Sequence, residues 1–414
     1  MKRYYPWLMA IMGMLVLMVS NGLTISGITA FDESLLTEFD WSRGALKFRD
    51  LITLLLAGVL APFLGIAIDR IGPKILILIG SLMLAALYFA YSRIGSVTHV
   101  YLIHLGFAAV LVSAGLNVAV IMVSQWFVTK RGTALGITLI GTSLGGVVLP
   151  KVIVAMLPVI GWRESFVWLS LVPLVLFLLV LMVVRTPAQM GMQAYGAGAD
   201  NRSAKGATDV LPDIGYAAAL RTRTFWALAA VAMTTFYSIM SASAHMFLHM
   251  RDMKFDLATS GQALAVMFGM GMVGKFLFGL LSDVFRPKGV FLFNLVVMAA
   301  GAFLLSTLKP ELIWYALVLF GLGWGGLYTM IQLLAVNAFG LSSAGKILGT
   351  ITLLDAATAG LGIWFTALLF DHFGNYRIAF NVFFGLVVLA FFIAMLVRNE
   401  RELIATQSTT ARQG

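Results

Sequence analysis

The segment that decides the fold is Gly65-Ile-Ala-Ile-Asp69, which closes a long apolar run and returns 214 residues later as Gly279-Leu-Leu-Ser-Asp283. Two further pairs recur at offsets of 213 and 214 residues: Gly132-x-x-x-Gly136 with Gly345-x-x-x-Gly349, and Arg163-Glu-Ser-Phe166 with Arg377-Ile-Ala-Phe380. All three pairs lie at equivalent boundaries of apolar runs. A self-similarity of this kind predicts that the chain consists of two related halves.

The composition predicts that the chain lives in lipid. Of its 414 residues, 60% are hydrophobic and only 11% are charged, whereas soluble domains carry about 25% charged residues. Each apolar run must form a helix, because hydrocarbon offers no partner for backbone N–H and C=O groups. Spans of sufficient length are expected near 7–30, 46–68, 75–93, 99–124, 133–156, 165–184, 224–248, 258–282, 288–308, 312–337, 346–369 and 376–397. We therefore predict an all-α membrane protein with about twelve transmembrane helices in two six-helix repeats.

The polar segments predict the domain boundaries and the orientation. The six-helix halves cover 1–185 and 224–398, a cytoplasmic linker covers 186–223, and a cytoplasmic tail covers 399–414. With a cytoplasmic N-terminus, most of the 28 lysines and arginines fall on the inner side, as the positive-inside rule requires. The outer residues in this tally include Arg43, Lys47 and Arg49. We expect a multi-pass protein of the cell (inner) membrane with both termini in the cytoplasm.

Several function classes are disfavoured by what the sequence lacks. The net charge of +10 is not gathered into a basic stripe, so no nucleic-acid partner is expected. There is no cysteine, no Walker-type phosphate loop and no clustered nucleophile, which argues against thiolate metal sites, direct ATP drive and an enzyme. His245 and His249 have metal-ligand spacing but no evident third ligand, so no metal and no cofactor is predicted. Two parallel repeats instead leave a central cavity with a solute site near the bilayer midplane.

A resemblance makes the architecture specific. Gly65-Ile-Ala-Ile-Asp69-Arg70-Ile-Gly72-Pro-Lys74 resembles the loop 2–3 signature of the major facilitator superfamily, G-x-x-x-D-R-x-G-x-K/R. The second copy, which ends in Arg286-Pro-Lys288, is a looser version, and the resemblance covers nearly the whole chain. Three further segments resemble the monocarboxylate and oxalate/formate porter branch: Glu38-Phe-Asp-Trp41-Ser-Arg43, Trp126-Phe127-x-x-Lys130-Arg131-Gly132-x-Ala-x-Gly136, and the Gly161-Trp162-Arg163 turn.

The resemblance implies a gate at the cytoplasmic mouth. A carboxylate such as Asp69 can face the positive N-terminal end of a neighbouring helix, while nearby cations clasp loops of the same half. The alternative is that these residues only form turns and set topology. The predicted gate residues are Gly65, Asp69, Arg70, Gly72, Lys74, Lys130, Arg131, Gly279, Asp283 and Arg286.

Two charged residues lie deep inside predicted spans. Lys275 precedes Asp283 by eight residues and Asp355 follows Gly345 by ten, which places them roughly 12 and 15 Å from the inner end at about 1.5 Å per residue. Such groups are costly in lipid and are functional candidates by default. A fixed ion pair between them, or a polar helix interface at Asp355, is the structural alternative.

In the resembled branch, a cation at this point of span eight, often an arginine, pairs with the substrate carboxylate. Lys275 supplies a point charge instead of a bidentate fork, and Gly271 stands where the branch often has an acid. Asp355 is the candidate for the missing proton-coupling acid. Asn117 and Tyr328 are candidates to hydrogen-bond the solute, although helix contacts explain them equally well. Gly141-x-x-x-Gly145 partly resembles an antiporter motif, and we interpret it as close helix packing.

The predicted function is secondary active transport of a small organic anion, a monocarboxylate, by alternating access with proton coupling. The partners are the small-molecule substrate, protons and the lipid bilayer, and the protein is expected to act as a monomer. The first alternative is a proton-driven antiporter of drugs or metabolites, and a membrane sensor or enzyme is the remote one.

Overall fold

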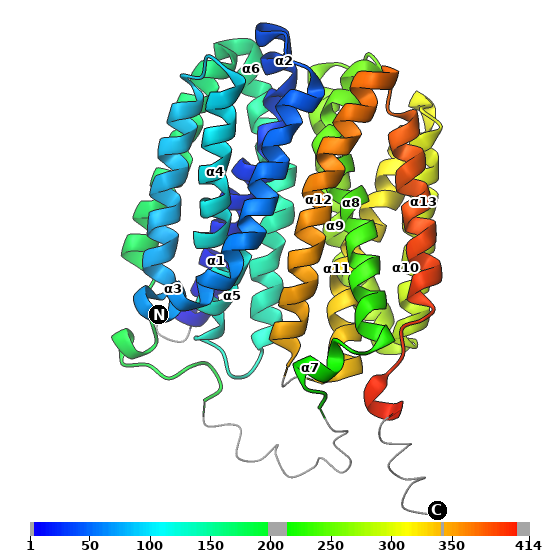
Figure 1. Ribbon diagram of the computed structural model, residues 1–414. Helices are drawn as coiled ribbons and strands as arrows, with labels where there is room; N and C mark the ends of the chain where they lie inside the picture. Colours follow the sequence, from blue (N-terminus) through cyan, green and yellow to red (C-terminus); the bar gives the residue numbers. More distant parts are fainter. Residues whose placement is uncertain (1–3, 198–212, 341–342, 404–414) are drawn as a thin grey trace, which may run out of the picture. The chain divides into compact units, whose positions relative to one another are not determined.

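The computed structural model describes residues 4–197, 213–340 and 343–403, and leaves a few helical side chains, those of Asp69 and Arg131 among them, outside the description. The described chain is almost entirely helical (Figure 1). This confirms the predicted all-α class. The central part of the linker and most of the tail lie outside the described residues, and the predicted flexible segment 196–209 is largely among them.

The helices of the first part of the chain are α1 (Tyr5–Asn21), the π-helix η2 (Gly22–Gly27), the 3-10 helix η3 (Ile28–Phe31), α2 (Asp32–Phe39), α3 (Arg43–Tyr91), α4 (Val97–Ser113), α5 (Leu116–Ser124), α6 (Arg131–Val183) and the 3-10 helix η4 (Ala188–Met190). Those of the second part are α7 (Tyr216–Ala219), α8 (Arg223–Asp252), α9 (Leu257–Val284), α10 (Pro287–Ser306), the 3-10 helix η5 (Pro310–Leu312), α11 (Ile313–Phe339), α12 (Ala344–Phe373) and α13 (Arg377–Ala394).

Ten helices among the described residues are long and apolar enough to cross a membrane. The segments α3 and α6 each combine two predicted spans, because a glycine interrupts them at a backbone conformation that other residues rarely adopt. These glycines are Gly72 (φ 78°) in α3 and Gly161 (φ 73°) in α6. With 53 residues, α6 is roughly 80 Å long, far more than the hydrocarbon thickness of about 30 Å. The total of twelve crossings stays a prediction.

The chain packs as two compact units. The first comprises Met1–Gly206 with Ser243–Phe268, and the second comprises Ala207–Ala242 with Gly269–Gly414. The junction between α8 and α9 therefore packs with the first unit, although it follows the linker in sequence. The division of the sequence into halves at 186–223 rests on the repeat and stays a prediction.

The repeat is visible in side-chain contacts. The Lys74 ammonium donates to the carbonyl of Leu181 at 2.8 Å, and 214 residues later the Lys288 ammonium donates to the carbonyl of Met395 at 2.7 Å. Both donor and acceptor are shifted by the same offset, so the two halves close the same connection. The left-handed residues Asp40 (φ 52°) and Lys254 (φ 68°) repeat the same spacing. The predicted duplication thus extends to backbone conformation and tertiary contact.

Glycines bring α1 against α6. A Cβ added at Gly141 would lie 2.1 Å from the carbonyl oxygen of Met14, and one at Gly145 would lie 2.7 Å from that of Met18. The backbones therefore touch where Gly141-x-x-x-Gly145 faces α1. Small residues serve this purpose in membrane helices generally, and the interpretation of this motif as close packing agrees with the geometry.

We predict that Gly141→Ala destabilises the protein, because its methyl group would overlap a backbone oxygen that cannot rotate away. The expected cost is about 1–3 kcal/mol, measured as a drop in the thermal unfolding midpoint of the purified protein. Gly136→Ala on the same helix is the matched control, since nothing lies within 4 Å of its added Cβ. Equal midpoints for the two variants would contradict the packing argument.

Candidate functional site

Lys275 on α9 lies against Tyr328 on α11, two residues that the sequence had proposed separately. The Lys275 ammonium is 5.4 Å from the centre of the Tyr328 ring, within the range of a cation–π contact. The hydroxyl of Thr329 donates to the carbonyl of Lys275 at 3.3 Å. The structure thus places a cation and a phenol together inside an apolar helix pair.

The close approach of α9 and α11 sets this geometry. A Cβ added at Gly325 would lie 1.8 Å from the carbonyl oxygen of Gly271, and one at Gly274 would lie 2.2 Å from that of Leu322. At Gly271 itself, an added Cβ would already meet the Trp324 ring at 3.3 Å. An acidic side chain at position 271 would have to displace Trp324, which gives a physical reason for the glycine that departs from the porter branch.

Asp355 is a buried residue of α12. It interacts electrostatically with Tyr328, so Tyr328 is linked to both charged residues. The structure does not form the Lys275–Asp355 pair that the sequence suggested: the ion pairs of the described residues do not join these two side chains. The hydroxyl of Thr358 bonds to the carbonyls of Asp355 (2.9 Å) and Met233 on α8 (3.2 Å) and helps to position this turn.

Asn117 lies on α5 in the first unit, and its side chain is exposed. The helix begins anew here because the chain breaks at Gly115, where an added Cβ would lie 1.8 Å from the carbonyl oxygen of Leu111. A role for Asn117 in substrate binding stays a prediction.

The predicted gate residues lie at helix ends and kinks. Gly72 forms the kink of α3, Lys74 clasps the end of α6 through the Leu181 carbonyl, and Lys130 precedes α6 with a left-handed backbone (φ 58°). Arg70, Asp283 and Arg286 are exposed. Gly279 has only ordinary contact with Thr329. The side chains of Gly65, Asp69 and Arg131 lie outside the description, so the gate role stays a prediction.

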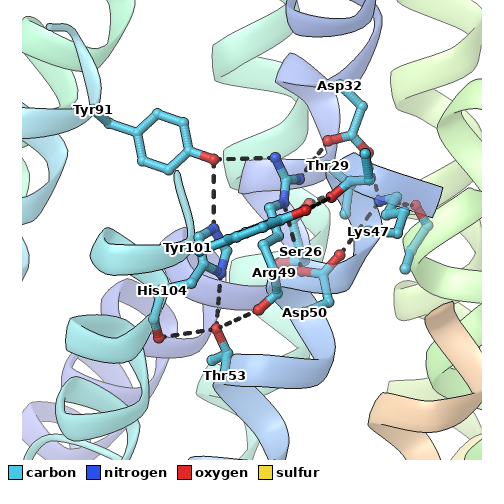
Figure 2. Close-up of polar contacts among 12 residues, drawn as sticks. Ser26, Thr29, Asp32, Lys47, Arg49, Asp50, Thr53, Tyr91, Tyr101 and His104 are labelled. Carbon is cyan, nitrogen blue, oxygen red and sulfur yellow. Dashed lines mark hydrogen bonds and ion pairs between the residues drawn. The ribbon is translucent and has the colours of Figure 1, made fainter. Parts of the chain in front are cut away.

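The first unit contains a buried charge cluster that the sequence reasoning missed (Figure 2). Lys47 and Arg49 on α3 are completely buried, and both pair with the buried carboxylate of Asp32 at the start of α2. The Lys47 ammonium lies 2.5 Å from Asp32 Oδ2 and also donates to the carbonyl of Ala244 at 2.7 Å. Counting Lys47 and Arg49 as outer-loop residues was therefore wrong.

Polar groups on neighbouring helices extend this cluster. Asp50 lies 3.8 Å from both Lys47 and Arg49. Arg49 donates to the Tyr91 hydroxyl at 3.1 Å, and His104 on α4 meets the Thr53 hydroxyl at 2.8 Å. The two cations and two carboxylates balance, as a buried ion group requires in order to offset the loss of hydration. The available signal was Lys47-x-Arg49-Asp50 inside an expected span, instead of beside one.

Three contacts, which we term the α8 clasp, join α2 and α3 to the end of α8. Arg43 pairs with Asp252 through two hydrogen bonds of 2.7 and 2.8 Å. Arg251 pairs with Glu33 at 2.7 Å, and Lys47 binds the Ala244 carbonyl. These contacts account for the packing of the α8–α9 junction with the first unit. Next to them, Asp256 begins α9, and its hydrogen bonds from Thr259 lower the pKa of this carboxyl.

The motifs that suggested the porter branch meet in space. The Glu38 carboxylate accepts hydrogen bonds from the Trp162 indole and the Arg163 guanidinium, and that guanidinium lies 4.1 Å from the centre of the Trp162 ring. Farther along the chain, Trp126 donates to the carbonyl of Arg185 at 3.0 Å. The first contact connects the segment after α2 to the kink of α6, so these residues have a structural role.

Sequence comparison identifies the family. The profile of the Major Facilitator Superfamily matches residues 9–363, and the chain belongs to that superfamily. It is therefore a membrane transporter that acts on a small-molecule substrate, and not an enzyme.

Among its relatives, the oxalate:formate antiporter of Oxalobacter formigenes is 24% identical over 86% of this chain and 85% of its own length. A transporter of Gibberella moniliformis is 32% identical, but the match spans only 38% of this chain and 39% of that protein. The solved structure of a D-xylose-proton symporter superposes with a TM-score of 0.74 at 14% identity, covering 96% of this chain and 98% of the symporter. That structural likeness confirms the fold.

We predict that Asp32→Asn strongly destabilises the protein, because it leaves Lys47 and Arg49 buried beside a neutral amide. Breaking a buried ion pair from one side costs about 3–5 kcal/mol. Glu38→Gln is the matched control, since its pair with Arg163 is roughly two-fifths exposed and such pairs contribute about 0–1 kcal/mol. Denaturant unfolding of the two purified variants compares them. Similar losses of stability would show that the cluster is solvated or unnecessary for folding.

Proposed function

We propose that the protein is a secondary transporter of a small organic anion, a monocarboxylate, which it moves by alternating access together with protons. The observation that carries the proposal is Lys275 against the Tyr328 ring. An ammonium offers three donors and a full positive charge, and a phenol adds one more donor. A carboxylate is the group that uses both: its charge is met by Lys275 and its second oxygen by the Tyr328 hydroxyl.

The relationship to the oxalate:formate antiporter supports this substrate class, because that relative matches along most of both chains. The lysine differs from the arginine that is frequent in the porter branch. A point charge imposes less geometry than a planar fork, so we expect a site that accepts several small carboxylates over one that selects a single shape.

Asp355 is the proposed proton carrier. A buried carboxylate within a span is costly to keep without a function, and it shares Tyr328 with Lys275. An anionic substrate bound beside Tyr328 would repel a negative charge on Asp355. Substrate and proton would then bind together, and two sites that influence each other in this way do so reciprocally.

The α8 clasp is the proposed closure on the outer side. We place both termini in the cytoplasm, because Lys47 and Arg49 no longer count as outer-loop charges and the bias of the remaining lysines and arginines keeps its sign. In this orientation the clasp lies at the outer end of α8. Opening toward the outside would then require Arg43, Arg251 and Lys47 to release α8.

We predict that Lys275→Gln abolishes binding of small carboxylates and leaves folding intact. Loss of a charge-assisted hydrogen bond costs about 1.5–3 kcal/mol, roughly a 10- to 100-fold loss of affinity. Binding is measured by the thermal stabilisation that acetate, lactate or oxalate gives the purified protein. Lys275→Arg should retain binding, and Lys151→Gln, which neutralises an exposed lysine of α6, is the control. Unchanged binding by Lys275→Gln, or stabilisation by cationic drugs alone, would favour the antiporter alternative.

We predict that Asp355→Asn separates transport from proton movement. Wild-type vesicles that contain a pH-sensitive dye should acidify when an external carboxylate enters. The variant should still exchange internal for external carboxylate, measured with a radiolabelled substrate, but without a pH change. Uptake by the wild type with no pH change would remove proton coupling from the proposal, and a persistent pH change in the variant would remove Asp355 from it.

A further inference from the structure

A pocket of about 490 Å³ lies in the second unit, away from Lys275 and Tyr328. It is formed where α10 begins, where α11 ends, and where the chain continues after α13. Its lining includes the cations Arg286, Lys288 and Arg398, the amide of Asn337, and the apolar side chains of Leu334 and Val397. The pocket therefore combines positive charge with apolar walls.

The charge in this pocket is not balanced by its own residues. The ion pairs of the described chain do not include Arg286 or Arg398. Lys288 uses one donor on the Met395 carbonyl. The acid in the lining, Glu402, accepts a hydrogen bond from Asn399 at 2.8 Å. Three cations against one carboxylate leave an excess of positive charge, and two arginines supply the donor geometry that suits a phosphate.

The pocket lies at a boundary between membrane and water. It adjoins the turn between α9 and α10 and the end of α13, which are ends of candidate spans. Large apolar side chains are exposed beside it: Val284 (76%) and Phe285 (62%) precede Arg286, and Leu396 (55%) precedes Val397. A basic pocket between transmembrane helices at this level, with an apolar flank, has the features of a lipid headgroup site.

The internal repeat shows that these cations are not needed for folding the connection. The first half makes the equivalent clasp between Lys74 and Leu181. However, the residues 214 positions before Arg286 and Arg398 are Gly72 and Val184. The clasp therefore forms without either arginine. Both arginines were added, or retained, in the second half alone.

We propose that this pocket binds the headgroup of an anionic phospholipid. The phosphate would lie between Arg286 and Arg398, and the acyl chains would run along Phe285 and Leu396. In the orientation proposed above, the lipid belongs to the inner leaflet. Because the pocket joins α10, α11 and the segment after α13, the lipid holds the ends of three helical segments of one unit together.

The test is a lipid titration of the purified full-length protein, followed by thermal unfolding. Phosphatidylglycerol should stabilise the wild type at concentrations at least tenfold lower than phosphatidylcholine, because both lipids have similar chains but only the first has a net charge. Inorganic phosphate should not reproduce this stabilisation at the same concentration. Equal stabilisation by the two lipids would overturn the proposal, and full stabilisation by phosphate alone would assign the pocket to a free anion.

The pocket is tested with the double variant Arg286→Gln/Arg398→Gln. It should lose the preference for phosphatidylglycerol, whereas Arg286→Lys/Arg398→Lys should keep most of it. The double variant Arg221→Gln/Arg223→Gln removes the same charge from exposed residues at the start of α8 and should keep the preference in full. Loss of the preference in this control, or its survival in the first variant, would show that general surface charge attracts the lipid. The wild-type titration decides the proposal even if a variant does not fold.

Discussion

The pairing of Asp32 with Lys47 and Arg49 shows the constraint on which the whole structure depends: hydrocarbon supplies no hydrogen bonds, so polar groups must find partners within the protein. Two cations with complete burial persist because one carboxylate receives both and because Tyr91 and the Ala244 carbonyl take further donors. The same constraint makes nearly all of the described chain helical. It also draws the end of α8 to the first unit, since Lys47 needs that carbonyl.

The internal repeat shows which features serve folding and which serve function. Both halves keep the clasp of a lysine on a distant carbonyl, Lys74 on Leu181 and Lys288 on Met395. The charges differ between them. The first half carries the buried cluster around Asp32, and the second carries Lys275, Asp355 and the basic pocket. Duplication preserved the backbone connections, and charges then diverged according to what each half binds or holds.

The architecture was readable from the sequence because it rests on local properties. Apolar runs, the 214-residue offset and the motif that contains Asp69 predicted the helices, the duplication and the superfamily. The contact between Lys275 and Tyr328 was half predicted: both residues were candidates, but their proximity depends on glycines that bring α9 and α11 together. Lys47 and Arg49 were misassigned to a loop, because charge near the end of an apolar run is typical both of a boundary and of a buried pair.

By itself, the sequence determined that this chain is a helical membrane transporter built from two related halves, because hydropathy and repetition act along the chain. Tertiary structure alone decided which charges are paired. It joined Asp32 to Lys47 and Arg49, separated Lys275 from Asp355, and brought Glu38 to Arg163 across the first unit. These outcomes depend on where helices cross, and the crossing points are set by small side chains whose contacts lie far away in the sequence.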